Sequence, residues 1–208
     1  MPYSAEAQRD PGQGRLAWLA LAAVLGAGAG LAFGHATGGL DWQPAMAWRE
    51  PWRAWTAAWV HFSALHLAAN LAGVGLVAAL GVAAHVPTRS AVAWLVAWPL
   101  TQLALVVRAD LLHYGGLSGV LHAGVAVVAL HLIVAGSGTR RRIGLAVLAV
   151  LVVKVASESP WADLVRHPAG WDIGVAPFAH LTGLLAGLAM AALGEAVQRQ
   201  PLTIVRHD

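Results

Sequence analysis

The chain has 208 residues, of which 58% are hydrophobic and 11% are charged, and its formal net charge is +3. Soluble domains usually contain about 25% charged residues, so this composition excludes a water-soluble globule and indicates a membrane protein built as one domain, residues 1–208. The chain has no cysteine, which excludes disulfides, cysteine-ligated metals and a thiol nucleophile.

A helix that crosses a membrane needs about 20 mostly apolar residues. We predict six such helices, forming an all-α bundle, at Leu16–Ala36, Phe62–Ala84, Ala91–Val107, Gly116–Ala135, Ile143–Ser157 and Pro177–Val197. The third and fifth runs are short for a full crossing. Tails of about 1–14 and 198–208 would lie outside the membrane.

The first run has an alternative interpretation as a cleaved signal peptide, because Arg9 and Arg15 precede it. Its apolar stretch is longer than the ~7–15 residues of a signal core and has no clear small-residue cleavage site. These features favour a retained span over a signal peptide.

Charge predicts the orientation of the helices. An even number of spans places both termini on one side, which then carries eight basic and four acidic residues, against five basic and six acidic on the other. Basic residues gather on cytoplasmic loops, and the run of Arg140, Arg141 and Arg142 contributes most to this asymmetry. We therefore predict that both termini are cytoplasmic.

The first external loop, Thr37–Val60, is rich in tryptophan. It holds half of the ten tryptophans in the chain, namely Trp42, Trp48, Trp52, Trp55 and Trp59. Tryptophan is favoured at the boundary between water and lipid, so we expect this loop to lie in the membrane interface.

The second predicted helix begins with polar side chains, which are costly in lipid and are therefore candidates for function. His66 and Asn70 are four residues apart, so a helix places them on one face, and His61 comes just before the apolar run. Two histidines could also form a metal site, but no inward carboxylate accompanies them, which makes that alternative weaker.

The fourth and sixth predicted helices begin with polar residues among glycines. The fourth run starts with Gly116, Leu117, Ser118 and Gly119, and His122 follows one turn later. The sixth run contains His180, followed by Gly183 and Gly187. The small-residue pairs Gly119-x-x-x-Ala123 and Gly183-x-x-x-Gly187 allow close approach of two helix backbones in lipid, although most such stripes serve packing alone.

The predicted orientation brings these residues into one layer. Helices two, four and six all run from the external side to the cytoplasmic side, and each polar cluster lies in the first turns of its helix. At a rise of ~1.5 Å per residue, four side chains fall at similar depths below the external surface. They are His66, Asn70, Ser118 and His180.

A serine beside a histidine is a nucleophile beside its base, and neutral hydrogen-bond donors can stabilise the oxyanion that forms after attack. His66 and Asn70 are donors of this kind, and glycines beside Ser118 let backbone amides approach a substrate. Each motif alone has an ordinary structural explanation, so the prediction depends on their convergence at one depth.

These residues resemble the rhomboid family of intramembrane serine proteases. Trp52 and Arg53, then His61, His66 and Asn70, are similar to the family's first-loop and second-span pattern. The string Gly116-Leu117-Ser118-Gly119 matches its nucleophile motif, and His180 with Gly183 and Gly187 matches its catalytic histidine. The short chain and the string from Gly116 to His122 further resemble the rhombosortase subgroup.

The resemblance implies a Ser–His dyad without an acidic third member. Ser118 would be the nucleophile and His180 the general base, with His66, Asn70 and the Ser118 amide forming the oxyanion hole. Gly116 and Leu117 would adjoin the bound substrate. Supporting roles would fall to Trp52, Arg53, His61, Gly119, His122, Gly183 and Gly187.

Two positions allow more than one interpretation. His122 stands where many rhomboid proteases have an aromatic ring stacked on the catalytic histidine, so it could stack, donate a hydrogen bond or titrate. Lys154 and Glu158 are four residues apart, which favours a local ion pair, with contact of Lys154 to substrate or lipid as the alternative.

The expected function is cleavage of membrane-anchored proteins near the external face of a bacterial inner membrane, without metal or other cofactor. Partners would be a transmembrane protein substrate and the lipid bilayer, with no nucleic acid. If the rhombosortase likeness holds, the substrates would be glycine-containing C-terminal sorting tails of exported proteins. The alternatives are an inactive binder of transmembrane helices and a small transporter or channel.

Overall fold

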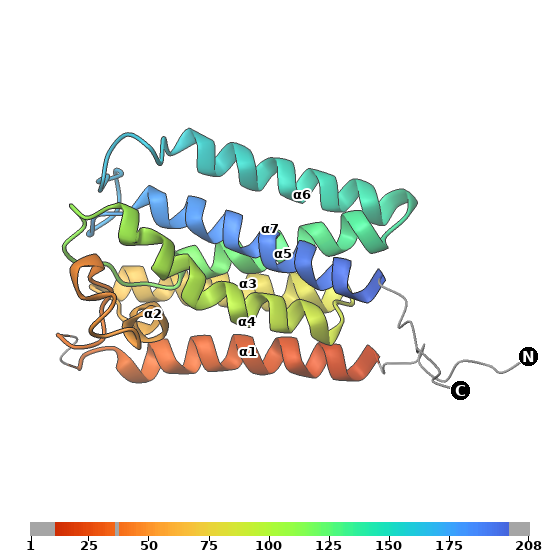
Figure 1. Cartoon of the computed structure of the whole chain (residues 1–208), viewed down its shortest axis with the longest axis horizontal. Helices are drawn as coiled ribbons and strands as arrows, with labels where there is room; N and C mark the ends of the chain where they lie inside the picture. The colour runs from red at the N-terminus through yellow and green to blue at the C-terminus, as the bar shows by residue number, and fades with distance from the viewer. Residues whose placement is uncertain (1–10, 36–37, 200–208) are drawn as a thin grey trace, which may run out of the picture.

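The computed structural model describes residues 11–35 and 38–199 of the chain. Within these residues the regular structure is helical, apart from two isolated β-bridges. Six long helices lie side by side along the long axis of the molecule (Figure 1). They are α1 (Pro11–Ala32), α3 (Ala64–Ala83), α4 (Thr88–Leu103), α5 (Ser118–Ala135), α6 (Gly138–Ser157) and α7 (Pro177–Arg199).

Short helices fill two of the connections. The loop between α1 and α3 contains η1 (Pro44–Met46), α2 (Arg53–Thr56) and η2 (Ala57–Trp59), and η3 (Ala104–Val107) continues α4. Five of the described helices, counting η3 with α4, are long and apolar enough to cross a membrane. α6 has 20 residues, but its three arginines and Lys154 make it less apolar, so its crossing stays a prediction.

α5 lies at the centre of the bundle, where it contacts α3, α4, α6 and α7. Buried tryptophans join neighbouring helices, α4 to α5 and α1 to α3, by hydrogen bonds from their indoles to backbone carbonyls. The indole of Trp94 donates to the carbonyl of Val120 at 2.8 Å, and that of Trp18 donates to Val77 at 3.1 Å. The two indole rings pack with centroids 4.4 Å apart. Each indole N–H is thereby satisfied inside an apolar core.

The helix starts and ends differ from the predicted ones where glycine conformation or charge intervenes. α1 ends at Ala32, because Gly34 has a φ of +82° that breaks the helix. α5 begins at Ser118 and not at Gly116, whose φ of +124° is incompatible with a helix. The predicted end of the first run at Ala36 and the loop start at Thr37 lie outside the described residues.

α6 begins at Gly138, five residues before the predicted start at Ile143. The arginines that suggested a loop belong to the first turns of the helix. Arg140 donates from Nη2 to the carbonyl of Ala84 at 2.7 Å, just past the end of α3, where helix carbonyls lack intrahelical partners. The charges of Arg9 and Arg206, and of Glu6, Asp10 and Asp208, lie outside the described residues.

The loop between α1 and α3 contains both exposed and buried tryptophans. Trp48 is 90% exposed and Trp52 is half-exposed, so the interfacial position of the loop stays a prediction. Trp42 is completely buried, and its backbone pairs with that of Tyr114 in an antiparallel bridge. The loop is therefore fastened to the segment that precedes Ser118.

Candidate active site

The hydroxyl of Ser118 lies 3.0 Å from Nε2 of His180. Ser118 is the first residue of α5, and His180 lies in the first turn of α7. Both side chains border a cavity of about 460 Å³. A serine hydroxyl within hydrogen-bond distance of a buried imidazole is the pairing that nucleophilic catalysis requires.

The predicted small-residue stripes of α5 and α7 meet, and their contact explains this pairing. A Cβ added to Gly183 would collide with the backbone carbonyl of Gly119, and one added to Gly187 would collide with the backbone of Ala123. A Cβ on Gly119 would lie 2.7 Å from the carbonyl oxygen of Ala179. The two backbones touch directly beside the serine and the histidine, which brings Ser118 and His180 together.

His66 and Asn70 lie beside the backbone that leads into Ser118. A Cβ added to Gly116 would stand 2.6 Å from Nε2 of His66 and 3.7 Å from Nδ2 of Asn70. Both side chains are buried, and the Asn70 amide donates to the carbonyl of His66 at 3.1 Å. His66 and Asn70 border the same cavity as Ser118.

His61 supports His66 from the preceding loop. The two imidazole rings have centroids 4.7 Å apart, and Nδ1 of His61 lies 3.1 Å from the carbonyl oxygen of Trp59, to which it donates. Burial lowers the pKa of His61, so its ring is neutral near pH 7. Ser63 caps α3 by accepting from the amide of His66 at 3.0 Å.

His122 stacks on His180, with ring centroids 4.2 Å apart and an angle of 12° between the planes. Its Nδ1 lies 2.6 Å from the carbonyl oxygen of Ser118, and its Nε2 lies 2.6 Å from Nζ of Lys154. The stacking interpretation of this position is thus confirmed together with two polar contacts.

An acidic residue does contact the histidine, contrary to the expected dyad. Oε2 of Glu158 lies 2.6 Å from Nδ1 of His180. The predicted Lys154–Glu158 ion pair is also present, at 3.0 Å. Sequence reasoning assigned Glu158 only to that local pair. The signal that could have included it is its position just past the C-terminal end of the fifth predicted span, which the predicted topology places at the same end of the bundle as Ser118 and His180.

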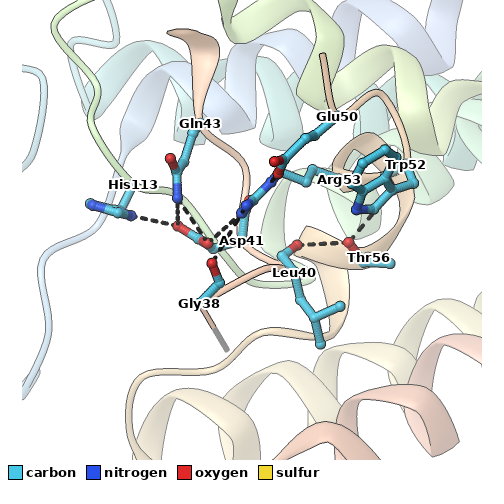
Figure 2. A network of polar contacts seen from close by, with 9 residues as sticks. All are labelled: Gly38, Leu40, Asp41, Gln43, Glu50, Trp52, Arg53, Thr56 and His113. Atoms are coloured by element: carbon cyan, nitrogen blue, oxygen red, sulfur yellow. Dashed lines mark hydrogen bonds and ion pairs between the residues drawn. The ribbon is translucent and has the colours of Figure 1, made fainter. Parts of the chain in front are cut away.

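Arg53 is the centre of a polar network in the loop between α1 and α3, whereas its neighbour Trp52 is half-exposed. Arg53 is buried and donates from Nη1 to the carboxylate and to the carbonyl of Asp41, each at 2.9 Å, and it also pairs with Glu50. His113 contacts the other Asp41 oxygen at 2.6 Å. Figure 2 shows this network converging on Asp41. The loop is thereby linked to the segment that runs into Gly116.

The cavity is bordered mainly by apolar side chains of α3, α5 and α6 and by the segment between α6 and α7. Gly73 and Val125 lie on its helical wall, and Trp171 and Val175 lie on the connecting segment. Asp172 in that segment accepts a hydrogen bond from the hydroxyl of Ser63 at 2.7 Å, which attaches the segment to the start of α3.

The side chain of Leu117 is completely buried in the core, so only its backbone is placed to adjoin a substrate.

Tyr114 is a cavity residue that sequence reasoning missed. Its ring is buried on the chain segment before Ser118, and burial raises the pKa of its phenol to about 12. The phenol therefore stays protonated at neutral pH.

Among the described residues there is no cluster of three or more histidine, aspartate and glutamate side chains arranged to hold a metal ion.

Comparison with known proteins gives one family. Residues 48–196 match the family model of the rhomboid domain, a range that contains every residue of the site described above except Asp41. No curated protein matches the chain.

Proposed function

Because the chain belongs to the rhomboid family, we propose that it is an intramembrane serine endopeptidase in which Ser118 and His180 carry the reaction. The observation that carries the proposal is the 3.0 Å contact between Ser118 Oγ and His180 Nε2 at the wall of an open cavity. A bundle of six long helices, five of them apolar enough to cross a membrane, supplies the setting that hydrolysis of a membrane-anchored chain requires.

In the proposed reaction, His180 takes the hydroxyl proton at Nε2 while the Ser118 oxygen attacks the peptide carbonyl. The resulting oxyanion accepts hydrogen bonds from the His66 ring, the Asn70 amide and the backbone amide of Ser118. His180 then returns the proton to the leaving amine. Water repeats the sequence on the acyl-enzyme and releases the acid product.

The substrate is a membrane-anchored protein whose helix must open locally for its peptide bond to reach Ser118. Small and helix-destabilising residues at the cut favour that opening. The similarity of the string Gly116–His122 to rhombosortases supports a narrower proposal, in which the substrates are glycine-containing C-terminal tails of exported proteins. The membrane would be the bacterial inner membrane, with the site toward the external side.

The test is cleavage of a single-span substrate by purified protein in liposomes, together with labelling by a serine-directed fluorophosphonate. Ser118→Ala should abolish labelling and lower the cleavage rate about 10⁴- to 10⁶-fold, because the nucleophile is lost. Undiminished cleavage by Ser118→Ala would refute the assignment of the nucleophile. Substrate capture without cleavage by the wild-type protein would support the inactive binder instead, and ion flux without labelling would support a channel.

A further inference from the structure

Glu158 and Lys154 form a polar network with the two stacked histidines. Besides its 2.6 Å contact with His180 Nδ1, Glu158 accepts from Lys154 through its other carboxylate oxygen at 3.0 Å. Nζ of Lys154 also lies 2.6 Å from Nε2 of His122 and 3.2 Å from Nδ1 of His180. The groups come from α5, α7 and the external end of α6, so the network joins three helices.

One arrangement of protons satisfies every short contact. A carboxylate only accepts hydrogen bonds, so Nδ1 of His180 must carry a proton and donate it to Glu158. In the neutral ring, Nε2 then has a free lone pair, and this is the atom that faces the Ser118 hydroxyl. His180 is thus held in the form that can act as a base.

The position of the ring proton on His122 follows in the same way. The backbone carbonyl of Ser118 only accepts, so Nδ1 of His122 carries the proton and Nε2 receives a hydrogen bond from the ammonium of Lys154. Lys154 therefore donates to His122 and to Glu158, which leaves Nδ1 of His180 to the carboxylate alone.

We propose that Glu158 is a positioning residue that completes a Ser118–His180–Glu158 triad, and that Lys154, which also contacts His122, holds its carboxylate in place. The inference rests on the proposed function and adds an acidic member to the expected dyad. Glu158 sets the orientation and proton position of His180 and stabilises the imidazolium that forms when Ser118 gives up its proton.

The environment keeps Glu158 ionised. Its side chain is 25% exposed, just past the end of α6. Partial burial acts to raise the pKa of this carboxyl, but the hydrogen bonds and charges of His180 and Lys154 outweigh burial and lower it to about 2. A negative charge therefore stands beside His180 at any pH at which a cleavage assay is practical.

Substitution of Lys154 can distinguish a positioning role of Glu158 from a merely structural ion pair. If the carboxylate is removed, the Lys154 ammonium is the remaining donor near His180 Nδ1, 3.2 Å away. Donation from Lys154 would place the ring proton on Nε2, where it cannot accept from Ser118. Loss of Glu158 should then be partly relieved by loss of Lys154, which a merely structural ion pair would not produce.

The experiment measures kcat and KM for a single-span substrate with the full chain in liposomes, and the rate of fluorophosphonate labelling. We expect Glu158→Gln to lower kcat and the labelling rate about 10²- to 10⁴-fold with little change in KM. Lys154→Met should lower kcat by less than about fivefold. The double variant Glu158→Gln with Lys154→Met should be faster than Glu158→Gln alone.

The matched control is Glu195→Gln. Glu195 forms a partly buried interhelical pair with Arg89 at 3.1 Å, near the other end of α7 and remote from Ser118. Its loss should leave kcat unchanged, although it breaks a comparable ion pair. If Glu158→Gln does not fold, Glu158→Asp replaces it, and a lowered kcat at unchanged KM supports the inference.

The outcomes distinguish failure of the proposed function from failure of the role proposed for Glu158. If the wild-type protein neither cleaves nor labels, the proposed function fails. If the wild type is active through Ser118 and a folded Glu158→Gln, or Glu158→Asp in its place, keeps wild-type kcat, only the role of Glu158 is overturned. Equal losses of kcat in Lys154→Met and Glu158→Gln would also overturn it, because the two residues would then act merely as a structural pair.

Discussion

Arg53 illustrates how a single buried charge organises the loop between α1 and α3. Arg53 is 5% exposed and Asp41 is 4% exposed, so the pair is removed from water. Charges buried in this way are retained only when they are paired and hydrogen-bonded, and here the carboxylate and carbonyl of Asp41 serve both needs. Arg53 therefore determines the path of the chain from Asp41 to α2.

We predict that Asp41→Asn destabilises the protein by about 1–3 kcal/mol, because the Arg53 guanidinium loses its buried counter-charge and retains only the more exposed Glu50. Thermal unfolding in detergent measures the loss. The control is Asp110→Asn, which breaks an exposed pair with Arg108 at 3.4 Å and should cost less than about 1 kcal/mol. Equal losses in the two variants would contradict a special role for the buried pair.

Residue-level prediction succeeded where a residue acts through its own helix, and it was incomplete where contacts cross helices. The spacing of Lys154 and Glu158 predicted their ion pair correctly, since residues four apart on a helix face each other. It could not show that the same carboxylate reaches His180, because that contact depends on the packing of α6 beside α7. The burial of Trp42 was likewise not apparent from the sequence, because it accompanies a backbone pairing with the distant Tyr114.

At the scale of the helices, the contact between α5 and α7 was predictable. Small residues four apart indicated close backbone approach, and the structure shows the Gly183 and Gly119 backbones in contact. The helix starts were less predictable, because they depend on the backbone conformation of Gly116 and on the capping contact of Arg140. Neither is apparent from hydropathy.

We predict that Gly183→Ala destabilises the bundle by about 1–3 kcal/mol and lowers the cleavage rate, because the added methyl forces α7 away from α5 and separates His180 from Ser118. Unfolding and cleavage assays measure both effects. Gly194→Ala on the same helix is the control. A Cβ at Gly194 would meet nothing within 4 Å, so this substitution should raise the free energy of unfolding by about 0.5–1 kcal/mol. Unimpaired cleavage by Gly183→Ala would contradict the role of this contact.

At the scale of the whole molecule, composition and charge predicted a helical membrane bundle, and the long helices are arranged accordingly. α1 begins and α7 ends at the same end of the bundle (Figure 1). The direction of the bundle in the membrane and the crossing by α6 remain predictions, since they rest on the distribution of charge.

The crossing by α6 can be tested directly, because the chain has no native cysteine. We predict that Asp163→Cys reacts with a membrane-impermeant maleimide added outside intact cells, whereas Ser137→Cys reacts only after permeabilisation. These exposed positions lie beyond opposite ends of α6. Reaction of both from outside would contradict the crossing, and the reverse pattern would invert the orientation.

The attachment of Glu158 to α6 has a mechanical consequence. Ser118 and His180 are paired through the close contact of the α5 and α7 backbones, but their acidic partner directly follows α6, a helix with few buried residues, namely Gly144, Leu151 and Val155. A tilt of α6 would withdraw the carboxylate while leaving the serine and histidine where they are. The proposed chemistry would then depend on the packing of α6 as well as on the contact between Ser118 and His180.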